Sequence, residues 1–321
     1  MTRVWACVFI ITLGMGSSAV IAQTYPAKSV RIVVGFPPGG TNDILARLIA
    51  ARLGDQMGQM FIVENRAGAN GIIGTEVVAK APPDGYSLLL QSVAHAINAS
   101  LYKKLPYDSI VDFAPVALLA SGQLVLVVHP SLPVATAKEL IALARTRPRA
   151  LNYASTGSGG SPHLAMELFK AMARVDIVHI PYKGTGPAIT DVLSGQITVM
   201  FPPLLPALPH ITAGKLRPLA VAGRERSAAA SNIPTMGESA LAGFEASAWF
   251  GVFVPAKTPR DIVARLNTEL NKALQGRELR ERLVSQGVEP QGGTPEQFEN
   301  YVKSEIMKWR KVVESSGARV E

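Results

Sequence analysis

Short apolar runs alternate along the chain with longer stretches in which apolar residues recur every three or four positions. A run of apolar positions indicates a buried strand, and the three-to-four spacing indicates a helix with one buried face. In the first third of the chain this pattern predicts strands at residues 30–36, 61–63 and 87–91, and helices at 42–57 and 71–81. Regular alternation of strands and helices predicts an α/β protein.

Two longer apolar passages, at residues 116–128 and 246–254, stand on either side of a second strand-and-helix series. Within that series the pattern predicts strands at 152–155, 177–180, 197–201 and 216–222, and a helix at 188–193. We interpret the two passages as strands that carry the chain from one lobe to the other and back. The predicted division is lobe 1 at residues 23–122 with 247–321, lobe 2 at 123–246, and a hinge of two crossings.

Helix-start signals support three of the predicted helices. Thr136 and Glu139 have the spacing of a capping box. A helix is predicted to begin at Thr258-Pro259 and to end near Gly276, and the last helix to begin at Thr294-Pro295 with Gln297.

Three glycine-rich loops each lead from a predicted strand into a helix, at residues 35–40 (GFPPGG), 155–163 (STGSGGSPH) and 183–187 (KGTGP). In the second loop we expect Ser161 to be the N-cap and Pro162 the first helical residue. The N-terminus of a helix has backbone N–H groups without intrahelical partners and the positive end of the helix dipole. Three such ends predict a site for a small carboxylate.

The N-terminal residues form a separate unit. Arg3 precedes a largely apolar run at residues 4–20, and Ala22 offers a small residue at a cleavage point. The run is short and broken by glycines, so it predicts a cleaved secretory signal peptide at residues 1–22 and an exported protein, rather than a membrane anchor. Cys7, the only cysteine, lies inside it, which leaves the mature chain without a thiol or a disulfide.

Charge and composition narrow the class of partner. The net charge is +8, of which Arg3 contributes one, and this balance favours anionic solutes. The basic residues are scattered, aromatic residues make up 6% of the chain, and no nucleic-acid motif is evident. We therefore interpret the basic residues of the last helix as a solvated face and expect no nucleic-acid partner.

An ordered set of motifs resembles one family. The motifs are GFPPGGTND at 35–43, RAGANG at 66–71, PPDGY at 82–86, LPYD at 105–108, NYAS at 152–155 and PYKGTGPA at 181–188. Together they resemble the Bug family, the TctC-like extracytoplasmic solute receptors of tripartite tricarboxylate transport systems. The resemblance implies a periplasmic binding protein fold of type II, with mixed, mainly parallel sheets in two lobes that close around a small carboxylate.

The resemblance also implies how the ligand is held and delivered. Loop amides, hydroxyls and ordered waters would bind the carboxylate, and permease subunits in the membrane would receive it from a monomeric receptor without a cofactor. One position departs from the family pattern, because Pro202 stands where an Asp commonly follows the strand. The departure removes an acceptor for a ligand amine or hydroxyl, and it favours simple organic or aromatic acids over amino acids.

Several residues are candidates for the site, and each has a structural alternative. The loop glycines could simply make tight turns, and the loop hydroxyls could cap backbone groups. Lys183 could neutralise a carboxylate or stay solvated, and Trp249 could line the cleft or pack in the core. We predict ligand contacts from Phe36, Pro38, Gly39, Gly40, Thr41, Ser92, His95, Ser155, Thr156, Gly157, Ser158, Gly159, Ser161, Lys183, Gly184, Thr185 and Pro202.

Catalysis is a weaker interpretation of the same residues. Ser158 with His163 is the least implausible nucleophile and base, but Gly157 directly precedes Ser158, so the loop does not have the G-x-S-x-G pattern of a nucleophile elbow. The five histidines show no metal-binding spacing, and Asp43 suits first-turn helix stabilisation. We expect a receptor that carries out no reaction. The alternatives are an exported hydrolase or transferase, and a ligand sensor for a membrane signalling protein.

Overall fold

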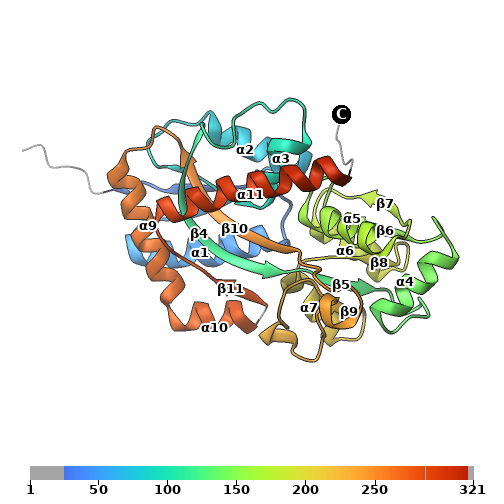
Figure 1. Cartoon of the computed structure of the whole chain (residues 1–321). Coiled ribbons are helices and arrows are strands. Elements are labelled where there is room, and N and C mark those ends of the chain that lie inside the picture. The colour runs from blue at the N-terminus through green and yellow to red at the C-terminus, as the bar shows by residue number, and fades with distance from the viewer. Residues whose placement is uncertain (1–24, 286, 317–321) are drawn as a thin grey trace, which may run out of the picture.

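The described part of the chain forms two β-sheets flanked by helices, which lie side by side as two lobes (Figure 1). This structure is a computed structural model that describes residues 25–285 and 287–316. The predicted signal peptide and Cys7 lie outside the described residues.

The first sheet has six strands in the order β11-β4-β10-β3-β1-β2. Strand β1 pairs in parallel with β2 and β3, whereas β10 pairs antiparallel with both β3 and β4, and β11 antiparallel with β4. The strands are β1 Val30–Val34, β2 Phe61–Asn65, β3 Ser87–Ser92, β4 Phe113–Gln123, β10 Ser247–Pro255 and β11 Val288–Pro290.

The second sheet has five strands in the order β7-β6-β8-β5-β9. Strand β6 is parallel to both of its neighbours, and β5 is antiparallel to both of its own. The strands are β5 Val125–Val128, β6 Asn152–Ser155, β7 Val178–Pro181, β8 Val199–Met200 and β9 Arg217–Val221.

The expectation of mixed sheets is confirmed, but the expectation that they are mainly parallel is wrong. Among the described residues, four strand pairs are parallel and five are antiparallel. The reason is the route of the chain between the sheets. Strand β4 leads out of the first sheet and β10 leads back into it, so the two lie side by side in opposite directions.

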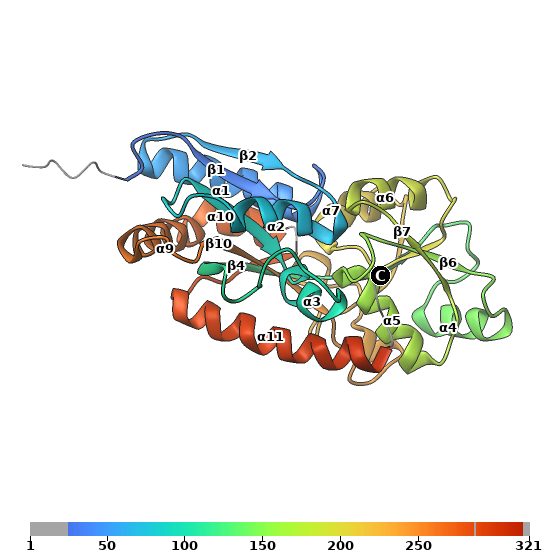
Figure 2. The ribbon, with the colours of Figure 1, turned by 90° about the horizontal axis from the view of Figure 1, so that it is seen from above.

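Helices cover both sheets, and the first residues of several of them line the cavity described below. Helix α11 runs along the first lobe, with its C-terminal end near α5 of the second lobe (Figure 2). The helices are α1 Thr41–Met57, α2 Ile72–Ala79, α3 Ala94–Leu101, α4 Ala137–Thr146, α5 Ser161–Ala173, α6 Thr185–Leu193, α7 Leu204–Thr212, α8 Met236–Ser239, α9 Arg260–Gln275, α10 Arg277–Ser285 and α11 Pro295–Ser316, with short 3₁₀ turns at Ala69–Gly71 and Ala228–Ala230.

The sequence pattern missed some elements for identifiable reasons. Helix α7 contains Pro209, and prolines in a helix interior normally count against a helix. Helix α3 lacks a side-chain cap, and β11 has only three residues. The passage at 116–128, predicted as one crossing strand, is divided between β4 in one sheet and β5 in the other.

The helix starts were only partly predicted. Thr136 accepts a hydrogen bond from the amide of Glu139, whose carboxylate in turn accepts from the amide of Ala135. Ser161, expected to be the N-cap of α5, is instead its first helical residue, and Gly160 is the cap. Because Gly160 offers no side-chain oxygen, the first amides of α5 receive no capping bond from it.

Apolar side chains fill both lobes. Trp249 is 1% exposed and donates a hydrogen bond to Glu305 of α11 at 3.0 Å, which places it in the core and not at a cleft.

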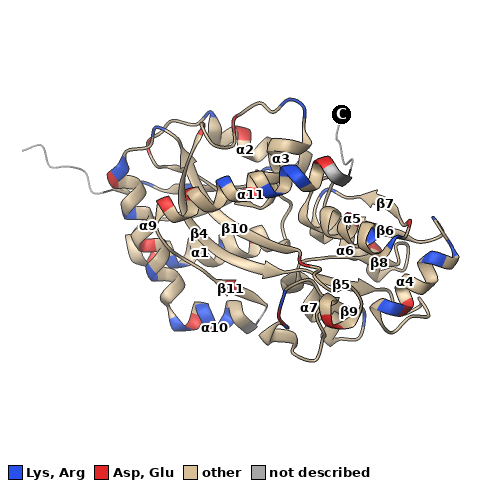
Figure 3. Ribbon diagram, viewed as in Figure 1, with Lys and Arg blue, Asp and Glu red and all other residues tan. Residues whose placement is uncertain are grey.

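No helix within residues 25–285 and 287–316 is both long and apolar enough to cross a membrane. On α9, α10 and α11, Lys and Arg alternate with Asp and Glu (Figure 3), as in the ion pair of Lys303 with Glu299.

Candidate ligand-binding site

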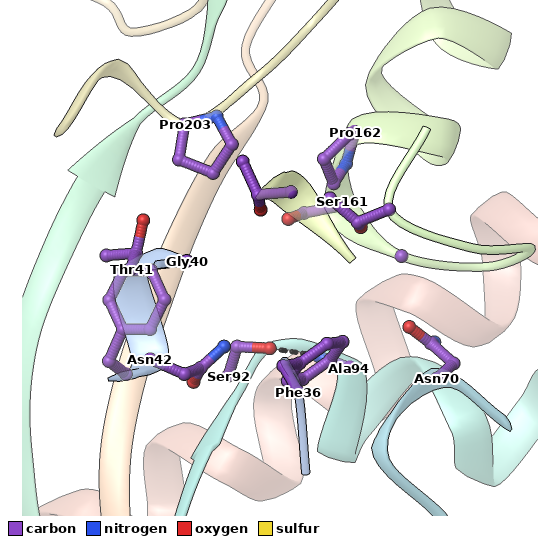
Figure 4. A pocket seen from close by; sticks show the side chains of 14 residues that line it. Phe36, Gly40, Thr41, Asn42, Asn70, Ser92, Ala94, Ser161, Pro162 and Pro203 are labelled. Atoms are coloured by element: carbon purple, nitrogen blue, oxygen red, sulfur yellow. Dashed lines mark hydrogen bonds between the residues drawn. The ribbon is translucent and has the colours of Figure 1, made fainter. Parts of the chain in front are cut away.

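A cavity lies between the two lobes and takes residues from both (Figure 4). It encloses about 440 Å³, a volume that includes space open to solvent. Its lining residues are Phe36, Gly40, Thr41, Asn42, Asn70, Ser92, Ala94 and Phe250 from the first lobe, and Thr156, Gly160, Ser161, Pro162, Thr185 and Pro203 from the second.

The first or capping residues of five helices are among the lining residues. They are Gly40, Thr41 and Asn42 of α1, Ala94 of α3, Gly160 and Ser161 of α5, Thr185 of α6 and Pro203 of α7. The first turn of an α-helix supplies no intrahelical acceptor for its amides. The helix dipoles add partial positive charge at the same ends. The cavity is therefore suited to an anion although its lining has no Lys or Arg side chain.

Loop 35–40 is held in place by Asp43, the third residue of α1. Its carboxylate accepts hydrogen bonds from the Gly39 amide, from Arg47 and from Asn65, each at 3.0–3.1 Å. Gly39 has a φ of 86°, which a residue with a side chain rarely adopts. Burial raises the pKa of Asp43, but the hydrogen bonds from Arg47, Gly39 and Asn65 outweigh burial and hold the pKa below its usual value. The ionised carboxylate thus fixes the loop next to the cavity.

Loop 155–160 is fixed by two histidines. Ser155 Oγ lies 2.6 Å from Nε2 of His179 and accepts a bond from the Gly157 amide. The Gly159 amide donates to Nδ1 of His163 at 2.9 Å. The two imidazole rings stack at 4.1 Å. The contacts with His179 and His163 hold the loop in place, so its glycines keep the conformations that the loop requires.

Three histidines, the buried His95 and His163 and the half-buried His179, are held in the neutral form. Burial lowers the pKa of His95 to about 4 and, with a smaller effect of His163, that of His179 to about 3. Burial also lowers the pKa of His163, against the opposing effect of Glu167. Nearby, Glu167 accepts bonds from Tyr153 and Lys170. These bonds, together with the charge of Lys170, overcome the effect of burial and lower the pKa of Glu167.

Acidification is expected to destabilise the fold between pH 7 and pH 5. In the unfolded chain each histidine takes up a proton near pH 6.5, whereas His95, His163 and His179 take it up at lower pH in the folded state. Each of these histidines therefore lowers the free energy of unfolding by up to about 1.4 kcal/mol per pH unit below pH 6.5. Urea unfolding at pH 7, 6 and 5 measures the slope, and His179→Gln should reduce it. A free energy of unfolding that stays constant from pH 7 to pH 5 would contradict this account of the histidines.

The predicted ligand contacts divide into two groups. The cavity brings together Phe36, Gly40, Thr41, Ser92, Thr156, Ser161 and Thr185. The other predicted residues are not among its lining residues: Pro38, Gly39, His95, Ser155, Gly157, Ser158, Gly159, Lys183, Gly184 and Pro202.

The residues outside the lining have other roles in this structure. His95 is fully buried, lies 2.8 Å from the carbonyl oxygen of Ser109 through Nε2, and packs against Phe113 and Phe253. The side chain of Lys183 is exposed. Pro202 accepts a hydrogen bond from the Val125 amide, and the next residue, Pro203, lines the cavity instead.

Sequence reasoning missed half of the lining residues. They are Asn42, Asn70, Ala94, Gly160, Pro162, Pro203 and Phe250. Asn70 lies inside the motif RAGANG, and an asparagine directly before a glycine is a signal for a left-handed turn. The position of Phe250 could have been inferred from the alternation of side chains along a strand. Its neighbour Trp249 points into the core, and successive side chains of a strand point to opposite faces.

Unpartnered polar atoms gather at the cavity. Among the described residues, nine buried side-chain oxygen or nitrogen atoms have no hydrogen-bond partner. Three of these belong to lining residues, namely Thr41 Oγ1, Asn42 Oδ1 and Asn70 Oδ1. A buried polar atom without a partner costs about 1–3 kcal/mol, so these atoms mark places where a ligand or water completes the structure.

The geometry does not assemble the catalytic pair. Nδ1 of His163 already accepts from the Gly159 amide, and its Nε2 lies 3.9 Å from Glu167. Within this loop, the hydroxyl that contacts a histidine ring is that of Ser155, which lies next to His179, and not that of Ser158. Among residues 25–285 and 287–316, no group of three or more His, Cys, Asp or Glu residues could hold a metal ion.

The sequence matches known proteins over its whole length. The profile of the tripartite tricarboxylate transporter family receptor, TctC, matches residues 45–318. Protein BugT of Bordetella pertussis is 39% identical over 325 residues, covering 100% of this chain and 99% of BugT.

Two solved structures with bound acids resemble the fold. Rpa4515 of R. palustris with adipate is 40% identical at a TM-score of 0.90, covering 91% of this chain and 98% of Rpa4515. MatC of Rhodopseudomonas palustris with bound malate is 33% identical at a TM-score of 0.85, covering 90% of this chain and 100% of MatC.

Proposed function

The chain belongs to the family of tripartite tricarboxylate transporter receptors, and from this premise we propose that it captures a small carboxylate between its two lobes and delivers it to a membrane transporter. The observation that carries the proposal is the cavity at which five helices begin. The acids bound by the related proteins Rpa4515 and MatC, adipate and malate, support the ligand class.

The carboxylate is held by neutral groups in this proposal. Amides from the first turns of α1 in one lobe and α5 in the other donate to its oxygens, and hydroxyls such as that of Thr41 add further bonds. Burying a carboxylate without partners would be very costly, so closure of the lobes requires these donors to be in place. Phe36 and Phe250 supply the apolar part of the lining that contacts the carbon chain.

Closure about a two-strand hinge is the second part of the proposal. Gln123 at the end of β4 pairs with Ser247 at the start of β10. Next to them, the Ala222 amide donates to Leu124, and the Ala246 amide donates to Ala222. These contacts support a hinge near residues 123 and 246, with residues 23–122 and 247–321 moving as one lobe and 123–246 as the other. The ligand would stabilise the closed form through contacts made only there.

The receptor is proposed to act in the periplasm after removal of residues 1–22, as a monomer that carries out no reaction. Receptors of this family are periplasmic, which supports the location. N-terminal sequencing of periplasmic material is expected to start at Gln23 or within two residues of it. Intact Met1 in a membrane fraction would contradict export with cleavage.

A thermal-shift screen of carboxylic acids tests the proposed function. An acid present at about a hundred times its dissociation constant should raise the free energy of unfolding by about 2.7 kcal/mol. Amides of the same acids serve as controls because they keep the shape but lose the charge. The proposal predicts stabilisation by at least one acid and none by its amide, with the acid recovered unchanged after incubation. No stabilisation by any acid, or conversion of the bound acid, would overturn it.

A further inference from the structure

One polar side chain in the cavity has a fixed orientation. Asn98 is fully buried, and its Nδ2 donates to the backbone oxygen of Asn70 at 3.1 Å. This bond turns Asn98 Oδ1 towards Asn70, where it accepts from Asn70 Nδ2 at 2.8 Å. The amide of Asn70 cannot flip without losing that bond, so the atom that it leaves free is Oδ1, which is only an acceptor.

The free oxygen faces the opposite lobe. Asn70 is 7% exposed, lines the cavity, and has no partner for Oδ1. Its side chain lies below the loop that carries Ser161 in Figure 4. A methyl group built on Gly160 would lie 3.3 Å from Asn70 Oδ1 and 2.7 Å from Thr156 Oγ1. Asn70 Oδ1 from one lobe and the hydroxyl of Thr156 from the other therefore both lie beside Gly160.

We propose that Asn70 and Thr156 form a hydroxyl subsite, so that the ligand is a carboxylate that also carries a hydroxyl group. The inference rests on the proposed function. The ligand hydroxyl donates its proton to Asn70 Oδ1, and its oxygen accepts from the hydroxyl of Thr156. One ligand group then bridges the two lobes and satisfies a buried acceptor.

The surroundings favour a hydroxyl over the other groups that could stand there. A second carboxylate offers only acceptors and would face the acceptor of Asn70. An ammonium group could donate, but no Asp or Glu lines the cavity to neutralise its charge. A hydrogen atom in place of the hydroxyl leaves Asn70 Oδ1 without a partner. Asn70 thus provides the kind of acceptor that the sequence lacks at Pro202.

Matched pairs of acids that differ by one hydroxyl test the inference. Calorimetry would compare malate with succinate, 2-hydroxyglutarate with glutarate, and lactate with propionate. In at least one pair the hydroxy acid is expected to bind about ten- to a hundredfold more tightly than the unsubstituted acid. The unsubstituted acid leaves the buried acceptor Asn70 Oδ1 without a hydrogen bond. Within each pair the unsubstituted acid controls for size and for the carboxylate contacts.

Variants then assign the preference to these residues. Asn70 has a φ of 52°, so Asn70→Gly removes the side chain at a position that glycine adopts without strain. This change, and Thr156→Val in the opposite lobe, should each bring the affinity ratio of the pair close to one. Asn98 is a positioning residue, and Asn98→Leu should lower the same ratio because the amide of Asn70 becomes free to turn. A merely structural loss would weaken both acids equally and leave the ratio unchanged.

Failure of this inference differs from failure of the proposed function. Equal affinity within every pair that binds, or a preference that survives Asn70→Gly, would overturn the hydroxyl subsite while leaving a carboxylate receptor. A tighter-binding unsubstituted acid would overturn it as well. If neither these six acids nor any member of the wider screen binds, the proposed function falls and the subsite falls with it.

Discussion

Replacement of Gly184 by alanine is expected to weaken carboxylate binding by about five- to a hundredfold. Gly184 caps α6 in the second lobe, and a methyl group on it would lie 2.6 Å from Cδ of Pro37 in the first lobe. The ring of Pro37 is rigid, so the lobes would have to separate by some tenths of an ångström. Overpacking of this kind costs about 1–3 kcal/mol, and the cost falls on the closed form that binds the ligand.

Two kinds of control separate this contact from backbone strain. Gly184 has a φ of 127°, so alanine is also strained there. Gly58 and Gly214 have φ values of 69° and 68° and open space around them, so Gly58→Ala and Gly214→Ala report a positive-φ penalty away from the cavity. Pro37→Ala in the Gly184→Ala background should restore affinity, because it removes the atoms that the methyl group would meet.

Calorimetry on folded variants measures the affinities, and small-angle scattering reports closure. The wild type is expected to show a smaller radius of gyration with saturating acid, and Gly184→Ala a smaller change. Failure of Pro37→Ala to restore binding would mean that the two loops do not meet in the bound form.

Replacement of Gly40 by valine is expected to reduce affinity by a hundredfold or more. Gly40 caps α1 and lines the cavity, with φ −85° and ψ 168°, which any residue adopts. The effect of a side chain there is therefore steric and does not arise from the backbone. A Cβ atom would lie 3.5 Å from Thr185 Oγ1, in ordinary contact, so Gly40→Ala should cost little. The additional methyl groups of valine would occupy space near the first amides of α1 and displace the carboxylate from them.

A graded series provides the measurement for Gly40. Affinity should fall slightly for alanine and steeply for valine, while the melting temperature without ligand changes little, because the added atoms lie in a cavity and not in the core. The loss of one hydrogen bond to a charged group costs about 1.5–3 kcal/mol of binding free energy. The loss of two such bonds therefore lowers the affinity by a hundredfold or more. Equal affinities for glycine, alanine and valine would place the carboxylate away from α1.

The parts of the candidate site that could be predicted from the sequence are those whose structure depends on neighbouring residues alone. The loops at 35–40 and 155–160 follow apolar runs and precede helical patterns, and both contribute cavity residues such as Gly40 and Thr156. The approximate positions of most predicted strands and helices also agree with the structure. These features depend on neighbouring residues, and periodicity reports such relationships.

Features that depend on distant contacts could not be predicted from the sequence. The orientation of Asn70 is set by Asn98, which is 28 residues away and bears no motif. His95 follows a strand as expected for a cleft residue, but its ring is buried by Phe113 from the next strand. Ser158 and His163 are close in sequence, but His163 bonds the amide of Gly159 instead. In each case tertiary packing decides between roles that the sequence leaves open.

A crystal structure of the protein with the acid that stabilises it most tests the position of the site most directly. The carboxylate is expected between the lobes, with its oxygens about 3 Å from the first amides of α1 and α5, and with a ligand hydroxyl between Asn70 and Thr156. An acid bound elsewhere, such as in the groove of the first lobe lined by Ser109, Arg260 and Lys303, would contradict the proposed binding site.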